Sequence, residues 1–108
     1  MITLSRNEEF ILLAVWRLRN DAYGVTIRRE FMSIANRPLH FGSLYNTLEL
    51  LMRKGLLACR ESRPDSRPGG RRKKLYTLTA PGRRALIEAR DVYRSAWKKA
   101  EGLDFESE

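Results

Sequence analysis

The residues best suited to recognising another molecule lie on one side of a predicted helix, Phe41 to Lys54. Leu44, Leu48 and Leu51 recur at helical spacing and, with Met52, are expected to point inward. Asparagine can form two hydrogen bonds with adenine, and arginine can form two with guanine, so the opposite side could bind DNA base edges. An ordinary solvated helix face would have a similar composition. That opposite side carries Gly42, Ser43, Asn46, Glu49 and Arg53, with Leu50 as an apolar exception.

The first turn of this helix suits phosphate groups as well as bases. Ser43 and the free backbone N–H groups of a helix N-terminus can bind a phosphate oxygen. Gly42 has no side chain and would let the backbone approach a DNA strand closely. The beginning of the helix is therefore expected to lie nearest to the polyanion.

A cluster of six basic residues follows in a segment rich in glycine and proline. Like charges at this density repel one another, so the cluster adds nothing to folding and favours binding to phosphates or to a narrow minor groove. A merely solvated basic loop is the alternative. The six residues are Arg63, Arg67, Arg71, Arg72, Lys73 and Lys74.

The net charge of +8 points to a polyanionic partner. Of the 21 Lys and Arg residues, nine fall between Gly55 and Arg84, against two of the 13 Asp and Glu residues. The excess charge is thus concentrated in one segment. Charge alone does not distinguish DNA from RNA or from an acidic membrane.

Several function classes are disfavoured by what the sequence lacks. Cys59 and His40 are the only residues of their kinds, which rules out an internal disulfide and a Cys/His structural zinc site. With no nucleophile–base pair, carboxylate pair or metal-ligand set, we expect neither enzymatic activity nor a cofactor. The longest apolar run, Phe10 to Trp16, is too short to cross a membrane, and no signal-peptide pattern is present. We therefore expect a cytoplasmic protein.

Three helices are predicted in the first half of the chain. Ser5 and Glu8 form a capping-box pattern, which predicts a helix from there to about Arg19. A second helix is expected from about Tyr23 to Ala35, and the helix from Phe41 to Lys54 is the third. The expected inward positions of the second helix are Val25, Ile27, Phe31 and Ile34.

Two strands and a last helix are predicted in the second half. Leu56 to Ser62 and Lys73 to Leu78 form a hairpin around the basic loop, and Thr79 caps a helix that reaches about Ala100. The predicted fold is mainly α with a β-hairpin wing (α+β), a winged helix-turn-helix with a C-terminal dimerisation helix. We assign residues 1–80 to the DNA-binding domain, 81–100 to the dimerisation helix and 101–108 to a frayed acidic tail.

Two helices have more apolar surface than one small core requires. The first helix is apolar on every face between Phe10 and Trp16, and the last helix carries a long apolar stripe. We predict that a second copy of the chain covers both. The alternatives are a first helix that is central in a monomer and a last helix that folds back on its own chain. The predicted dimer interface comprises Phe10, Leu13, Trp16, Leu86, Ala89, Tyr93, Ala96, Trp97 and Ala100.

Four segments of the chain are similar to motifs of a known family: Asp21–Glu30, Gly42–Leu48, Gly55–Leu57 and Gly70–Gly82. In this order and spacing they resemble the second helix, the recognition helix, the turn into the wing, and the return strand with the start of the last helix in the PadR-like transcriptional regulators. The resemblance covers roughly Phe10 to Arg90. Together the four segments are far more specific than any one of them.

The resemblance implies a winged-helix homodimer that binds operator DNA, most often as a repressor. Some members release DNA when they bind a small molecule, often an aromatic one. The matching positions assign DNA contacts to Ser43, Tyr45 and Asn46 and to the basic residues of the wing. This chain departs from many members by having His40 and Phe41 in place of Ser or Thr followed by Pro, and Asn46 in place of Pro.

We predict a sequence-specific DNA-binding regulator, a repressor that binds a palindromic operator as a homodimer. Trp16 and Trp97 could meet across the dimer axis and bound a site for a small aromatic effector, or could simply be interface packing. An RNA- or ribosome-binding winged helix and a protein-interaction accessory module are the alternative functions. The predicted DNA-binding residues are Gly42, Ser43, Tyr45, Asn46, Arg53, Arg67, Arg71, Arg72, Lys73 and Lys74.

Overall fold

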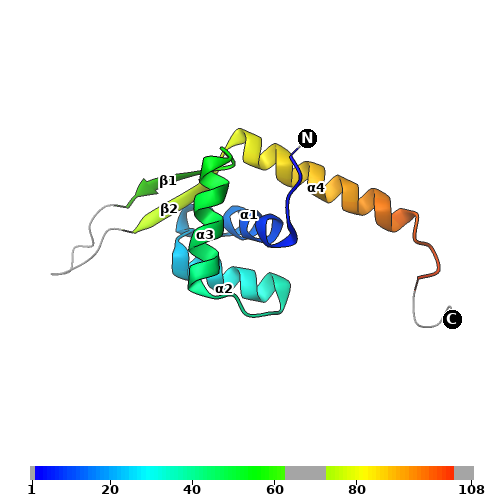
Figure 1. The fold of residues 1–108 in the computed structure, drawn as a ribbon, viewed down its shortest axis with the longest axis horizontal. Coiled ribbons are helices and arrows are strands. Elements are labelled where there is room, and N and C mark those ends of the chain that lie inside the picture. Colours follow the sequence, from blue (N-terminus) through cyan, green and yellow to red (C-terminus); the bar gives the residue numbers. More distant parts are fainter. Residues whose placement is uncertain (1, 63–72, 104–108) are drawn as a thin grey trace.

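The computed structural model of the chain describes residues 2–62 and 73–103, arranged as in Figure 1. The predicted order of three helices, a hairpin and a helix is confirmed, and with it the mainly α fold with a β-hairpin. Element ends differ from the predicted ones by one or two residues. The elements are α1 (Arg6–Leu18), a 3-10 turn (Arg19–Asp21), α2 (Gly24–Ala35), α3 (Phe41–Arg53), β1 (Leu57–Glu61), β2 (Lys74–Leu78) and α4 (Ala80–Lys98).

The start of α1 is capped as predicted and is tied to the end of α3. The Ser5 hydroxyl accepts a hydrogen bond from the Glu8 amide at 3.1 Å, and the Ser5 amide donates to Glu8 Oε1 at 2.8 Å. The second carboxylate oxygen of Glu8 lies 2.6 Å from the Lys54 ammonium nitrogen. One side chain therefore satisfies a helix N-terminus and fixes α1 against the residue that follows α3.

The core is formed by the inner faces of α1, α2 and α3. Leu44, Leu48 and Leu51 of α3 are fully buried, as predicted, whereas Met52 is only half-buried. In α2, Ile27 and Phe31 are buried and Ile34 is half-buried. The prediction for Val25 was wrong, because this side chain lies in the first turn of α2 and is 45% exposed.

The β-hairpin forms the predicted wing and is attached to the helical body by its second strand. β1 and β2 pair antiparallel, with Leu57 opposite Leu78 and Glu61 opposite Lys74. The Tyr76 amide donates to the Ala22 carbonyl at 2.8 Å, which joins β2 to the segment before α2. The Tyr76 side chain is buried in the hydrophobic core, and burial raises the pKa of its phenol. The wing is therefore anchored beside the N-terminus of α2.

The last helix begins in close contact with the turn that ends α3 and then leaves the body. The Thr79 hydroxyl accepts from the Gly82 amide at 3.0 Å and donates to the Gly55 carbonyl at 2.6 Å. A Cβ on Gly82 would lie 2.1 Å from the Leu56 carbonyl oxygen, so only glycine allows this approach. The hairpin and the distal part of α4 extend from the body in opposite directions (Figure 1). Among the described helices, none is long and apolar enough to cross a membrane.

Candidate nucleic-acid interface

The outer side of α3 carries four of the predicted DNA-binding residues. Gly42, Ser43, Asn46 and Arg53 are all exposed, and they lie opposite the leucines that enter the core. Leu50 lies on the same side and is 39% exposed, which makes it the apolar exception that the sequence indicated. The side chains that could contact base edges are therefore free of the protein's own packing.

The N-terminus of α3 has no side-chain cap. His40 occupies the N-cap position and accepts no hydrogen bond through its side chain. The first intrahelical hydrogen bond runs from the Leu44 amide to the His40 carbonyl, so the amides of the first turn have no partner within the helix. Such amides can donate to a phosphate oxygen.

The Tyr45 side chain of α3 lies against the start of α2. A Cβ on Gly24 would lie 2.2 Å from the Tyr45 hydroxyl oxygen, so the tyrosine occupies the space that any side chain at Gly24 would fill. Its side chain is nevertheless 49% exposed. Tyr45 therefore joins α3 to α2 while it still presents part of its ring to solvent.

The described basic residues of the wing lie next to Tyr45. Lys73 and Lys74 line a shallow hollow together with Tyr23, Val25 and Tyr45. The Lys73 ammonium nitrogen lies 4.1 Å from the centroid of the Tyr23 ring, a cation–π distance. This contact places a positive charge at the junction of the wing and α2. The remaining predicted basic residues, Arg63, Arg67, Arg71 and Arg72, lie outside the described residues.

We call the exposed predicted DNA-binding residues of these two segments the α3–wing surface: Gly42, Ser43, Tyr45, Asn46 and Arg53 of α3 with Lys73 and Lys74 of the wing. All of these residues are exposed, and Tyr45 lines the same hollow as Lys73 and Lys74, which joins the two parts of the surface. In the part of the chain that the structure describes, no group of His, Cys, Asp and Glu residues could hold a metal ion.

The ion pair between Glu8 and Lys54 holds α3 in position from its C-terminal end. Burial alone would raise the pKa of Glu8, but hydrogen bonds from Lys54 and Ser5 outweigh it and hold this pKa below its ordinary value of 4.5. The Glu8 carboxylate is therefore ionised at neutral pH, so the salt bridge with Lys54 is intact at the pH at which the protein would bind DNA.

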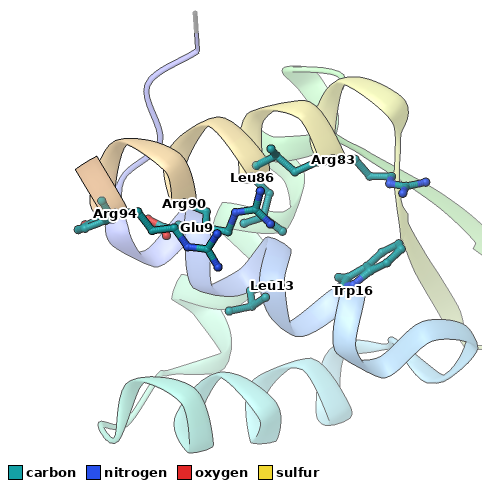
Figure 2. A pocket seen from close by; sticks show the side chains of 9 residues that line it. Glu9, Leu13, Trp16, Arg83, Leu86, Arg90 and Arg94 are labelled. Carbon is teal, nitrogen blue, oxygen red and sulfur yellow. The ribbon is translucent and has the colours of Figure 1, made fainter. Parts of the chain in front are cut away.

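A groove of about 530 Å³ separates α1 from α4 (Figure 2). Leu13 and Trp16 line it from α1, and Leu86 and Tyr93 line it from α4. Three arginines of α4 also face this groove, although the sequence did not single them out: Arg83, Arg90 and Arg94. Glu9 lies on the α1 side, where burial raises the pKa of its carboxyl against the opposing effect of Arg6.

The predicted interface residues differ in their exposure within one chain. Phe10, Leu13 and Trp16 of α1 are half-buried, so α1 is covered completely only on its core side. Leu86 is half-buried because it packs against the chain's own core. Further along α4, Ala89 and Ala100 are half-buried, whereas Tyr93, Ala96 and Trp97 are exposed, Trp97 by 62%.

Trp16 and Trp97 line separate hollows within one chain. Trp16 faces Arg83 near the start of α4, with 4.9 Å between the guanidinium carbon and the indole centroid. Trp97 lines a second hollow with Arg6, Phe10 and other residues near the start of α1. The two indoles therefore lie near opposite ends of the α1–α4 contact, and a meeting between them would need a second chain.

Comparison with known proteins identifies the family. The model of the transcriptional regulator PadR-like family matches residues 12–88. A PadR family transcription regulator from Clostridium difficile is 26% identical, covers 87% of this chain and 93% of its own, and superposes with a TM-score of 0.69. RosR of H. salinarum is 25% identical, covers 96% of this chain and 83% of its own, with a TM-score of 0.63.

Among curated protein sequences, none matches this chain significantly. The family match nevertheless runs from α1 to the first half of α4, and it includes α3 and the hairpin, which carry the α3–wing surface. It confirms the resemblance inferred from the sequence and the expectation of a DNA-binding regulator without enzymatic activity. The chain belongs to the PadR-like family of winged-helix transcriptional regulators.

Proposed function

We propose that this PadR-like regulator is a cytoplasmic repressor that binds a palindromic operator as a homodimer and releases it when a small aromatic effector binds. The α3–wing surface is the observation that carries the proposal. In a helix-turn-helix protein the recognition helix enters the major groove with its N-terminal residues near the base edges. In this chain Asn46 and Arg53 would contact bases, while Ser43 and the first-turn amides would contact phosphate.

The wing supplies the sequence-independent part of the binding energy. Lys73 and Lys74 would contact the phosphates that flank the major groove, and Arg67, Arg71 and Arg72 would extend these contacts towards the minor groove. Each phosphate neutralised releases counterions, so the affinity should fall steeply as the salt concentration rises. A protein-interaction module would show no such dependence.

Selection of bound sequences from random duplex DNA tests the operator directly. We expect enrichment of a sequence with two-fold symmetry, because two recognition helices of a symmetric dimer bind equivalent half-sites about one helical turn apart. An RNA-binding winged helix would enrich no palindrome and would prefer RNA in a competition assay. Enrichment of one asymmetric site would contradict the dimeric arrangement but not DNA recognition.

The homodimer is supported by the exposed apolar side chains of α4. Val92, Tyr93 and Trp97 are 56%, 36% and 62% exposed, and the groove beside α1 is open. Apolar surface left in water costs about 25 cal/mol per Å², so a dimer in which a second copy covers both features would be stabilised. Residues 81–100 would then act as the dimerisation helix and residues 1–80 as the DNA-binding domain.

Light scattering should give a mass of twice 12.6 kDa at micromolar concentration. Replacing Tyr93 and Trp97 by Asp should give monomers or aggregates, because each change would bury an unpaired charge in the interface. Ser95→Asp is the control for each single replacement, since it adds one carboxylate on the side of α4 opposite Tyr93 and Trp97 and should remain dimeric. A monomeric unmodified protein would contradict the proposal.

Tryptophan fluorescence tests the effector site, because Trp16 and Trp97 are the only tryptophans. Planar aromatic ligands should quench the fluorescence saturably and should also weaken operator binding, since a ligand shifts the protein only by favouring one dimer geometry. Trp16→Phe and Trp97→Phe each leave one reporter and show which indole lines the site. If a broad panel of ligands changes neither signal, the indoles serve only for packing.

A further inference from the structure

We infer that Phe41 recognises the 5-methyl group of a thymine in the operator. This inference rests on the proposed function, because it needs α3 to bind in the major groove. Phe41 is the first residue of α3, is 42% exposed and is not part of the hydrophobic core. The sequence patterns that indicated Asn46 and Arg53 gave no role to this residue.

The Phe41 ring is held in place by its neighbours although it is exposed. The Arg28 guanidinium carbon lies 4.5 Å from the ring centroid, and Tyr45 stacks nearly parallel at 6.2 Å with 21° between the planes. Arg28 is itself fixed, because its Nε–H donates to the Leu39 carbonyl at 2.6 Å. A side chain that is already ordered loses little conformational entropy when it binds a partner.

The position of Phe41 determines what it can contact. Residues at the N-terminus of a recognition helix lie closest to the base edges. An aromatic ring cannot hydrogen-bond to a phosphate oxygen, and against a polar base edge it would leave donors or acceptors unsatisfied. The thymine methyl group is the apolar feature that unmodified bases present in the major groove. An exposed, fixed phenyl ring at this position matches that group.

The neighbours also bring charge to the same place without competing for the base. Arg28 carries its positive charge over the ring, so it could contact the phosphate backbone while Phe41 contacts the thymine methyl group. Tyr45 links the stack to α2 through its contact with Gly24. Phe41 is thus a specificity-determining residue, and Arg28 and Tyr45 are the residues that position it.

Replacing thymine by deoxyuridine tests the inference, because this change removes only the 5-methyl group. Each thymine of the selected operator is replaced singly, and dissociation constants are measured by fluorescence anisotropy. In one position per half-site, deoxyuridine should weaken binding about fourfold, the factor expected for exposing one buried methyl group. In Phe41→Ala the thymine and deoxyuridine duplexes should bind equally at that position.

Two further variants keep the result interpretable. Leu50→Ala removes another exposed apolar side chain of α3 and should retain the preference for thymine. If Phe41→Ala does not fold, Phe41→Gln keeps a long side chain without an apolar ring and should show the same loss of discrimination. Each comparison is a ratio of two constants for one protein preparation, so the fraction of active protein cancels.

The outcomes separate this inference from the proposed function. Equal binding of thymine and deoxyuridine duplexes by the unmodified protein, with operator specificity intact, would overturn only the role of Phe41. A methyl preference that persists in both Phe41 variants would overturn it as well. Failure of the selection to enrich any duplex would overturn the proposed function and this inference with it.

Discussion

Gly42→Ala should stabilise the free protein and weaken its binding to DNA. Gly42 is the second residue of α3, its φ is negative, and a Cβ built on it meets no atom within 4 Å. Replacing glycine by alanine in a helix favours folding by up to about 1 kcal/mol, because the unfolded chain loses conformational freedom. Near a helix end we expect about 0.5 kcal/mol, which raises Tm by about 2–4 °C in a domain of this size.

The effect on binding has the opposite sign, because the same methyl group points to the space that DNA would occupy. Crowding a packed contact costs about 1–3 kcal/mol, which corresponds to a loss of about 5- to 150-fold in operator affinity. Circular dichroism measures the thermal unfolding, and fluorescence anisotropy with the selected operator measures the affinity. Only an interface residue would show a gain in one measurement and a loss in the other.

Gly82→Ala is the matched control, since it makes the same chemical change where the protein itself fills the space. Its Cβ would lie 2.1 Å from the Leu56 carbonyl oxygen, so backbone must move, and we expect a destabilisation of about 1–3 kcal/mol. If Gly42→Ala raises stability and leaves operator affinity unchanged, the start of α3 does not approach DNA. If it lowers stability, the space around Gly42 is not open as described.

Three further predictions concern the same surface and its support. Asn46→Ala should relax the preference at one base position and cost about 1–3 kcal/mol on the correct operator, which a repeated selection and titration would measure. Replacing Lys73 and Lys74 together by Ala should weaken binding to all duplexes and reduce the salt slope by about one per lost phosphate contact, without changing base preference. Lys54→Met should lower the free energy of unfolding by about 1.5–3 kcal/mol, because it leaves the Glu8 carboxylate without its charged partner. The pKa of Glu8 is lowered in the folded protein, so ionised Glu8 contributes its full stabilisation at a pH above its ordinary pKa of 4.5. This stabilisation disappears as the pH falls through the folded-state pKa. Denaturant titrations across this pH range should show a smaller loss of unfolding free energy in Lys54→Met than in the unmodified protein.

Local patterns in the sequence were sufficient to predict the elements and much of the surface. The Ser5 and Glu8 capping box, the leucines of α3 and the Thr79 cap depend on residues three or four positions apart, and a sequence displays such spacings directly. Exposed polar residues on α3 follow from the same periodicity. These features depend little on the rest of the fold.

Contacts between distant residues could not be predicted in the same way. Lys54 reaches Glu8 across 46 positions, and the close approaches at Gly24 and Gly82 depend on how two elements pack. Val25 was expected in the core because it is apolar and suitably spaced, yet it lies at the hollow between α2 and the wing. The arginines that face α1 from α4 were missed because only the packing of α4 against α1 shows that they line the same groove.

The close contact between Gly82 and Leu56 joins the start of α4 tightly to the end of α3, the proposed recognition helix. The 19 residues of α4 span about 28 Å, so a tilt of about 5° displaces the far end by roughly 2.5 Å. Because the Leu56 carbonyl lies where a Cβ of residue 82 would be, this contact has little room to deform, and we expect a tilt of α4 to move the end of α3 with it. In the proposed dimer, a small change in the angle at which the two α4 helices cross would alter the separation of the two recognition helices. Successive major grooves lie about 34 Å apart, so operator affinity would depend on the angle between the two α4 helices.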